Sequence, residues 1–136
     1  MEELDINGEW PELLNKKLDE LIIQEYWYKG KLTEQVNSIW LNIQNVWHRL
    51  YFDFGIIFWR KYNDRPNNYE FNPDDMYNYP LREITSKLQL KGQVIKDCTG
   101  CAIPGGSQVI FFFANNQQLI FKNINDNTTY EIIETK

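Results

Sequence analysis

Residues 38–62, SIWLNIQNVWHRLYFDFGIIFWRKY, constrain the fold of this chain more than any other stretch. Tryptophan, tyrosine, phenylalanine and isoleucine dominate it, and these residues are enriched in β-strands. Gln44-Asn45 and Asp53-Phe54-Gly55 interrupt the run with residues that are typical of tight turns. Apolar segments separated by such turns indicate a β-meander, in which Gly55 would supply a positive φ.

A helix is the alternative for residues 36–50. Several of their apolar residues recur at the i, i+3, i+4, i+7 spacing of a helix face: Val36, Ile39, Trp40, Ile43, Val46, Trp47 and Leu50. Ile39, Leu41 and Ile43 instead alternate as they would in a strand. We favour strands because Asn45 breaks the run and strand-forming residues dominate it. The sequence leaves both readings of this segment open.

The rest of the chain predicts further strands and two short helices. Strands are expected over residues 21–28, 56–62, 93–97, 108–114, 118–124 and 128–134. Proline fits the first turn of a helix, so Pro11 favours a helix over residues 12–17 and Pro80 favours one over 81–88. The predicted fold is therefore α+β: a mainly antiparallel sheet of two meander-like halves with one or two short helices. The last strand would be an edge strand, able to pair with a second copy.

The length and composition indicate one folded domain over residues 1–136. A hydrophobic content of 43% with 15% aromatic residues excludes a disordered chain. Residues 1–12 read as a loose acidic lead-in, and residues 63–79 as a long polar loop. The start of the sequence lacks the basic and apolar regions of a secretory signal, and its two cysteines do not require an oxidising compartment. We therefore expect a cytoplasmic location.

The charge of the chain bears on its partners. Its formal net charge is −5, from 14 basic and 19 acidic residues. An acidic surface repels phosphate backbones, so nucleic acid is not an expected partner. No apolar run is long enough to cross a bilayer, so a membrane is not expected either. A basic protein is the partner that such a surface would attract.

Cys98 and Cys101 form a Cys-x-x-Cys pair. Redox activity of such a pair relies on a thiolate at the start of a helix, whereas the following Pro104-Gly105-Gly106 cannot form one. A structural zinc site takes four ligands, and these two thiols would supply only half of them. We interpret them as two reduced thiols flanking a turn, with a redox or metal role left open.

His48 is the only histidine and hence the natural general base at neutral pH. Its expected position in a strand among aromatic residues favours a structural role, so an enzyme using His48 is an alternative function. A second alternative is a domain that binds a carbohydrate or another small ligand through exposed tryptophans. Trp27, Trp40, Trp47 and Trp59 all lie within expected strands, however, and the core of so small a protein could contain most of them. We expect no catalytic residue, cofactor or metal.

The loop 63–79 is the strongest candidate for recognition. It combines tyrosines, a common residue at binding surfaces, with closely spaced carboxylates, and loops of this length are often functional. The predicted partner-binding residues are Tyr69, Glu70, Phe71, Asp74, Asp75, Tyr77 and Tyr79. We expect their carboxylates to meet a basic partner and their rings to supply the buried contacts.

Residues 36–60, VNSIWLNIQNVWHRLYFDFGIIFWR, resemble a type of small bacterial protein that is often an immunity protein to polymorphic or contact-dependent toxins. The shared pattern is W-H-R-x-x-x-D-x-G-I-x-F-W, matched by Trp47, His48, Arg49, Asp53, Gly55, Ile56, Phe58 and Trp59. The resemblance implies a small, acidic, cytoplasmic and non-catalytic chain that neutralises a toxin by occlusion. The immunity class is structurally diverse, so it implies no defined binding residues.

Overall fold

The computed structural model describes residues 5–67 and 69–134, and every regular element within them is a β-strand. In chain order the strands are β1 (Ile6–Asn7), β2 (Lys17–Tyr28), β3 (Lys31–Ile43), β4 (Val46–Asp53), β5 (Ile56–Tyr62), β6 (Tyr77–Asn78), β7 (Leu81–Glu83), β8 (Gln93–Ile103), β9 (Gly106–Phe113), β10 (Gln117–Ile124) and β11 (Asn127–Glu134). The hydrogen-bonded path runs β1-β5-β4-β3-β2-β8-β9-β10-β11, and β6 and β7 both pair with β2. The predicted antiparallel character of the sheet is confirmed, because only the short pair β1–β5 is parallel.

Strands β2 to β5 form the first meander, and their turns explain its sharp reversals. Lys29-Gly30, Gln44-Asn45 and Phe54-Gly55 each adopt positive φ at both residues, as type I′ turns require. This turn type matches the twist of the strands that it joins. The strand reading of residues 36–50 is therefore confirmed: β3 ends and β4 begins at the Gln44-Asn45 turn.

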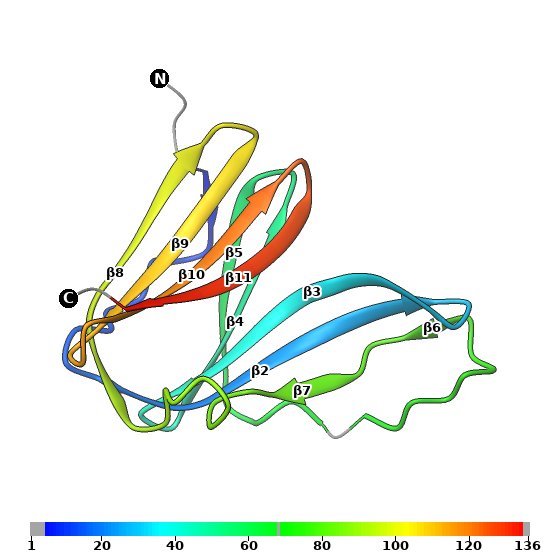
Figure 1. The fold of residues 1–136 in the computed structure, drawn as a ribbon, viewed down its shortest axis with the longest axis horizontal. Coiled ribbons are helices and arrows are strands. Elements are labelled where there is room, and N and C mark those ends of the chain that lie inside the picture. The colour runs from blue at the N-terminus through cyan, green and yellow to red at the C-terminus, as the bar shows by residue number, and fades with distance from the viewer. Residues whose placement is uncertain (1–4, 68, 135–136) are drawn as a thin grey trace.

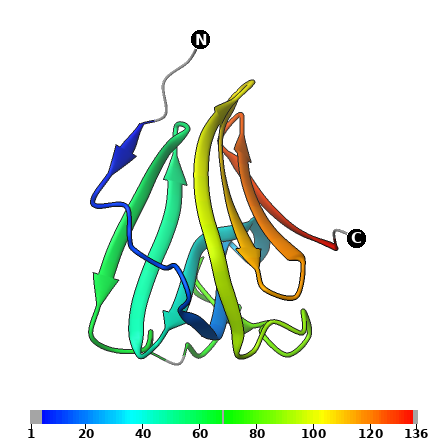
Figure 2. The same ribbon diagram turned by 90° about the vertical axis from the view of Figure 1, so that its left-hand side faces the viewer.

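Strands β8 to β11 form the second meander, which faces the first (Figures 1 and 2). The start of β8 pairs with the start of β2, where Lys17 lies opposite Val94, so the two meanders are joined along one sheet path. Figure 2 shows the segment between β1 and β2 crossing the open side between them. Trp10 anchors this segment through a ring contact with Trp59 at 5.3 Å and a 3.3 Å hydrogen bond to the carbonyl of Cys98.

The core lies between the two meanders. Alternate residues of each strand point inward, as the period of two in a strand requires. The largest fully buried side chains include Trp59, Leu50 and Ile57 on the first meander and Phe111 and Phe121 on the second. The rings of Trp59 and Phe111 lie 6.1 Å apart and connect the two layers. Burial of these large apolar side chains is the main force that holds the meanders together.

The predicted helices are wrong, and with them the α+β fold class: the described residues form an all-β structure. Residues 81–83 form β7, in which Leu81 lies opposite Gln24 of β2. Residues 85–89 then form turns. The unpaired edge of β2 offers hydrogen bonds to this segment, and pairing there outweighs the weak local preference for a helix.

The other predicted helix, over residues 12–17, is replaced by a turn and the first residue of β2. The amide of Lys16 bonds to the carbonyl of Leu13, and the amide of Asn15 bonds to that of Ile95 in β8. Contact with the second meander thus decides this conformation. Among residues 5–67 and 69–134 there is no helix with the length and apolarity that spanning a bilayer requires.

The hairpin β2–β3 projects from the body of the molecule (Figure 1). Strand β4 pairs with β3 only as far as Ile39, whereas β2 and β3 remain paired out to Tyr28 and Lys31. Strand β6 lies along the outer part of β2. We call residues 25–35 together with residues 69–79 the arm.

Candidate functional site

Asn78 organises the part of the predicted loop that lies in the arm. Its side chain is fully buried, and its Oδ1 accepts hydrogen bonds from the Tyr69 hydroxyl at 2.8 Å and the Asn72 amide at 3.1 Å. Its Nδ2 donates to the Asn72 carbonyl at 2.9 Å. The neighbouring residue Tyr77 pairs with Tyr28, which holds the segment against β2. Residues 69–79 are therefore an ordered surface segment held to the sheet.

Four tyrosines gather on one face of the arm. The ring of Tyr26 lies 5.2 Å from that of Tyr79 and 6.3 Å from that of Tyr77, and Tyr28 lies 5.6 Å from Tyr77. We call these four residues the tyrosine patch. Tyr77 is 51% exposed, Tyr28 38% and Tyr79 37%. Partial burial of Tyr26, together with Tyr79 and Tyr77, raises the pKa of its hydroxyl, so this ring is uncharged at neutral pH.

The remaining predicted aromatic residues lie apart from this patch. Phe71 packs edge-on against Trp27 at 5.1 Å. Neighbouring residues of a strand point to opposite faces, so Trp27 and Tyr26 face opposite sides of the arm. Tyr69 is only partly exposed because its hydroxyl bonds to Asn78. The structure thus brings Tyr77 and Tyr79 together and separates them from Tyr69 and Phe71.

The predicted carboxylates Glu70, Asp74 and Asp75 are all exposed. A turn at Asn72 presents two of them: its Oδ1 accepts from the Asp74 amide, and its carbonyl accepts from the Asp75 amide, both at 3.0 Å. In the part of the chain that the structure describes, no three acidic, histidine or cysteine side chains come close enough to hold a metal ion. The carboxylates therefore give the arm an acidic rim without a metal-binding geometry.

The sequence analysis missed Tyr26 and Tyr28, which β2 contributes to the patch. The signal was present in the run Tyr26-Trp27-Tyr28 directly before the turn at Lys29-Gly30. At the end of a hairpin both faces of a strand are exposed, so alternation alone would have placed these two tyrosines together on one face.

His48 lies on the inner face of β4 and is 3% exposed. Its Nδ1 accepts a hydrogen bond from the indole Nε1 of Trp59 at 2.9 Å. Burial, with smaller contributions from Lys61 and Lys16, lowers the pKa of His48 from 6.5 to about 4. The imidazole is therefore neutral at pH 7, and one of its nitrogens is engaged within the core.

The two cysteines lie within β8, so the prediction that they flank a turn is wrong. They are free thiols three positions apart in a strand, which directs them to opposite faces. Cys98 packs against the core, and burial raises the pKa of its thiol far above the ordinary value. Cys101 is exposed, and its Sγ accepts from Gln108 Nε2 at 3.2 Å. This geometry keeps the two sulfurs from acting on one substrate or metal.

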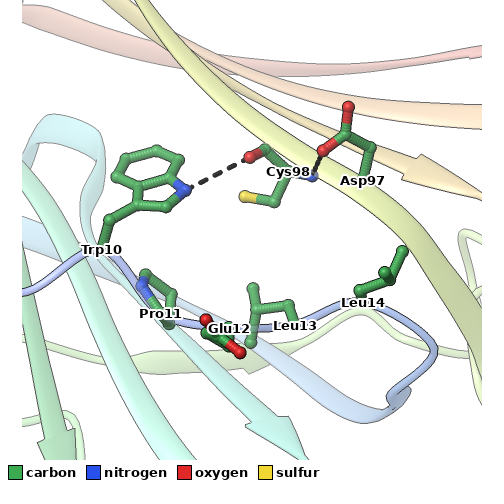
Figure 3. A pocket seen from close by; sticks show the side chains of 7 residues that line it. All are labelled: Trp10, Pro11, Glu12, Leu13, Leu14, Asp97 and Cys98. Atoms are coloured by element: carbon green, nitrogen blue, oxygen red, sulfur yellow. Dashed lines mark hydrogen bonds between the residues drawn. The ribbon is translucent and has the colours of Figure 1, made fainter.

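An open pocket of about 380 Å³ lies beside Cys98, between the crossing segment and β8 (Figure 3). Its lining residues are Trp10, Pro11, Glu12, Leu13, Leu14, Asp97 and Cys98. The Cys98 thiol is protonated at neutral pH because of its raised pKa, so it is a poor nucleophile. The pocket offers an apolar wall without a group poised for chemistry.

The strand tryptophans are packed against protein groups. Trp59 is 2% exposed and Trp47 5% exposed. Trp40 is partly exposed, but the Arg49 guanidinium lies 5.3 Å from its ring and Tyr62 also lies 5.3 Å away. Trp27 contacts Phe71. A sugar stacks on a free ring face, so these contacts reduce the ring area that a sugar could use.

Comparisons with known proteins give no match: no family model fits the sequence, no curated protein is significantly similar, and no solved structure matches the fold significantly. The function must therefore be argued from the chemistry of the surface.

Proposed function

We propose that this chain is a non-catalytic protein-binding domain of the immunity type, which neutralises a bacterial toxin by occluding it. The observation that carries the proposal is the arm: it projects from the body and combines the exposed tyrosine patch with Glu70, Asp74 and Asp75. Tyrosine is enriched at binding surfaces because one rigid side chain supplies both apolar area and a hydrogen-bonding group.

The order of the arm favours tight binding. Ordering a flexible loop on binding costs free energy, and here Asn78 and the pairing of β6 with β2 order residues 69–79 in advance. The tyrosines also support each other through ring contacts, so little side-chain freedom remains to be lost. The arm therefore presents a preformed surface.

The charge of the arm favours a basic protein as the partner. Glu70, Asp74 and Asp75 are exposed, and the arm carries five carboxylates against two lysines, Lys29 and Lys31, both next to its hairpin turn. The chain as a whole carries a net charge of −5. Complementary potentials accelerate encounter and hold the two surfaces in register. A basic toxin domain in the cytoplasm fits this surface better than nucleic acid or a membrane.

The residues of the pattern that resembles immunity proteins have structural roles in this fold. It spans β4, the turn at Gly55 and β5, and its His48 and Trp59 are joined by a buried hydrogen bond. Gly55 adopts φ 76°, which a type I′ turn requires. The resemblance therefore supports the class of protein, while the proposed binding residues rest on the arm.

The alternatives fit the surface less well. An enzyme using His48 would need that imidazole to reach a substrate, yet it is buried and bonded to Trp59. A carbohydrate-binding domain would need free ring faces, yet Trp40 and Trp27 already pack against protein groups.

The proposal is tested by capturing the partner with the tagged chain and then measuring protection. We expect the wild type to retain a stoichiometric basic protein, and to restore growth of cells that produce that protein. Asp74→Lys/Asp75→Lys and Tyr77→Ser/Tyr79→Ser should each weaken capture at least about tenfold, as the loss of central contacts does. Glu131→Lys/Glu134→Lys is the matched control, because it makes the same charge change on exposed residues of β11.

Two results would overturn the proposal. One is undiminished capture by both arm variants, which would place the interface elsewhere. The other is a captured partner whose toxicity is unaffected by co-production of this chain, which would remove the neutralising role.

A further inference from the structure

The outer face of the first meander carries two arginines in one row. Arg49 of β4 lies directly opposite Arg60 of β5, and Trp40 of β3 lies on the other side of Arg49. Side chains directly opposite each other in an antiparallel pair lie about 5 Å apart at Cβ, and like charges in this arrangement are destabilising. A pair of cations here lowers the stability of the fold, and its presence therefore suggests a binding function.

Neutral groups hold each guanidinium. Arg49 donates from Nε and Nη2 to Ser38 Oγ at 3.1 and 3.0 Å. Arg60 donates from Nη1 to the carbonyls of Asn7 at 2.8 Å and Trp59 at 3.0 Å, and from Nη2 to Asn7 Oδ1. Among the described residues, no carboxylate forms an ion pair with either arginine. Neither guanidinium is therefore in direct contact with a described carboxylate.

Aromatic rings surround this row and leave few free faces. Tyr51 and Phe58 stack on each other at 4.7 Å with an interplanar angle of 6°. The guanidinium of Arg49 covers Tyr51 at 4.8 Å and Trp40 at 5.3 Å, and that of Arg60 lies 5.9 Å from Phe58. A ligand approaching this surface meets guanidinium donors beside rings that are already stacked.

These contacts distinguish between anionic ligands. Bases of single-stranded nucleic acid need free ring faces on which to stack, and the rings beside Arg49 already pack against each other or against its guanidinium. Carboxylates need only donors and positive charge, which guanidinium groups supply in a matching geometry. An acidic peptide is thus the ligand that fits best.

We propose that this surface, which we call the arginine face and define as Trp40, Arg49, Tyr51, Phe58, Arg60 and Tyr62, binds an acidic segment of a partner protein through its carboxylates. Arg49 leans toward β3 and Arg60 toward β1, so one extended peptide crossing the strands can place a carboxylate on each. The surface has the opposite charge to the arm, which it adjoins at the pocket that Glu34 and Arg49 both line.

Carboxylates next to Arg49 bound the arginine face on one side. Glu34, Asp53 and Asp126 line a pocket of about 250 Å³ that Arg49 also lines. Asp53 lies four residues from Arg49 on β4, about 13 Å along the strand at 3.3 Å per residue. The acidic segment therefore lies along the row of the two arginines and away from the pocket.

The test measures binding of fluorescein-labelled hexaglutamate by fluorescence anisotropy at low and high salt. We expect saturable, salt-sensitive binding that Arg49→Gln/Arg60→Gln weakens at least tenfold. Arg65→Gln/Arg82→Gln is the matched control: it removes the same charge from arginines that pair with Glu20 and Glu25, and should leave the affinity nearly unchanged. Asp74→Lys/Asp75→Lys should still bind, which separates this surface from the arm.

Three outcomes would overturn the inference. The first is absence of hexaglutamate binding by the wild type at low salt. The second is an equal loss of affinity in the control variant, which would indicate non-specific attraction. The third is tighter, arginine-dependent binding of labelled hexathymidylate, which would assign the face to phosphates. Unfolding curves for each variant establish that the compared proteins are folded.

Discussion

His48 shows how a single side chain can resemble a catalytic base in the sequence and belong to the core in the fold. It is the only histidine of the chain and lies in the pattern that resembles immunity proteins. The fold places its ring edge-on to Trp59, with centroids 5.9 Å apart, and gives its Nδ1 a donor. Since Nδ1 accepts this bond, the proton of the neutral ring is on Nε2.

The lowered pKa of His48 predicts a loss of stability in mild acid. The unfolded chain binds a proton at His48 near pH 6.5, and the folded chain only near pH 4. Between these values the unfolded state holds more protons, so the free energy of unfolding decreases as the pH falls. We expect it to be about 2 kcal/mol lower at about pH 5 than at about pH 7.

Urea unfolding followed by tryptophan fluorescence measures this difference. In His48→Gln, whose amide oxygen can still accept from Trp59, most of the pH dependence should be lost. An unchanged pH dependence in this variant would show that other groups cause it.

The arm carries the proposed binding residues, and a small number of contacts hold its conformation. Its outer segment has a short strand, β6, and few buried apolar side chains, so its order depends on Asn78. Polar groups left without partners in a buried site cost about 1–3 kcal/mol. Removal of Asn78 would take away the acceptor of the Asn72 amide and leave the Tyr69 hydroxyl only its 3.5 Å contact with the Tyr77 carbonyl.

We therefore expect Asn78→Ala to loosen residues 69–79 while the body stays folded. Amide hydrogen exchange should become at least about tenfold faster in this segment, as the loss of about 1.4 kcal/mol or more implies. Exchange in β4 and β9 should stay the same. Asn67→Ala, an exposed position of the same loop, is the control. Equal exchange in the two variants would contradict the role of Asn78.

At the scale of the whole molecule, Trp10 joins the two meanders across their open side. Its ring contacts Trp59 of β5, and its Nε1 donates to the carbonyl of Cys98 in β8. Strands β5 and β8 are not paired with each other, so this contact closes a gap that the sheet path leaves open.

Trp10→Ala should lower the free energy of unfolding by about 2 kcal/mol, somewhat less than for a fully buried tryptophan. It should also speed modification of Cys98 by a thiol reagent, measured in a Cys101→Ser background. Leu14→Ala changes a residue of the same pocket that is 65% exposed, and should alter both quantities little. If Trp10→Ala changes neither the free energy of unfolding nor the rate of Cys98 modification, Trp10 does not hold the two meanders together.

The free edge of β11 stays a candidate for pairing with a second copy. It lies at one end of the sheet path, and among residues 5–67 and 69–134 its only strand partner is β10. Several of its side chains, including Glu131, Ile133 and Glu134, are exposed. The predicted homodimer through this edge remains a prediction that light scattering would test.

The sequence by itself determined most strands of the two meanders, although it ended β8 at residue 97, where the strand runs on to Ile103. Alternation of apolar residues and turn residues such as Gln44-Asn45 act over a few positions, so residues 56–62 form β5 with the predicted bounds. It also determined that the loop 63–79 carries exposed aromatic and acidic side chains, because composition requires no knowledge of register.

Only the tertiary structure decided which residues meet. Strand pairing joins segments far apart in the chain: Leu81 pairs with Gln24 instead of starting a helix, and Tyr79 reaches Tyr26 while Phe71 reaches Trp27. The bond between His48 and Trp59 likewise depends on the register of β4 and β5. Sheet register is set by the packing of the whole core, so local patterns predict strands but not their neighbours.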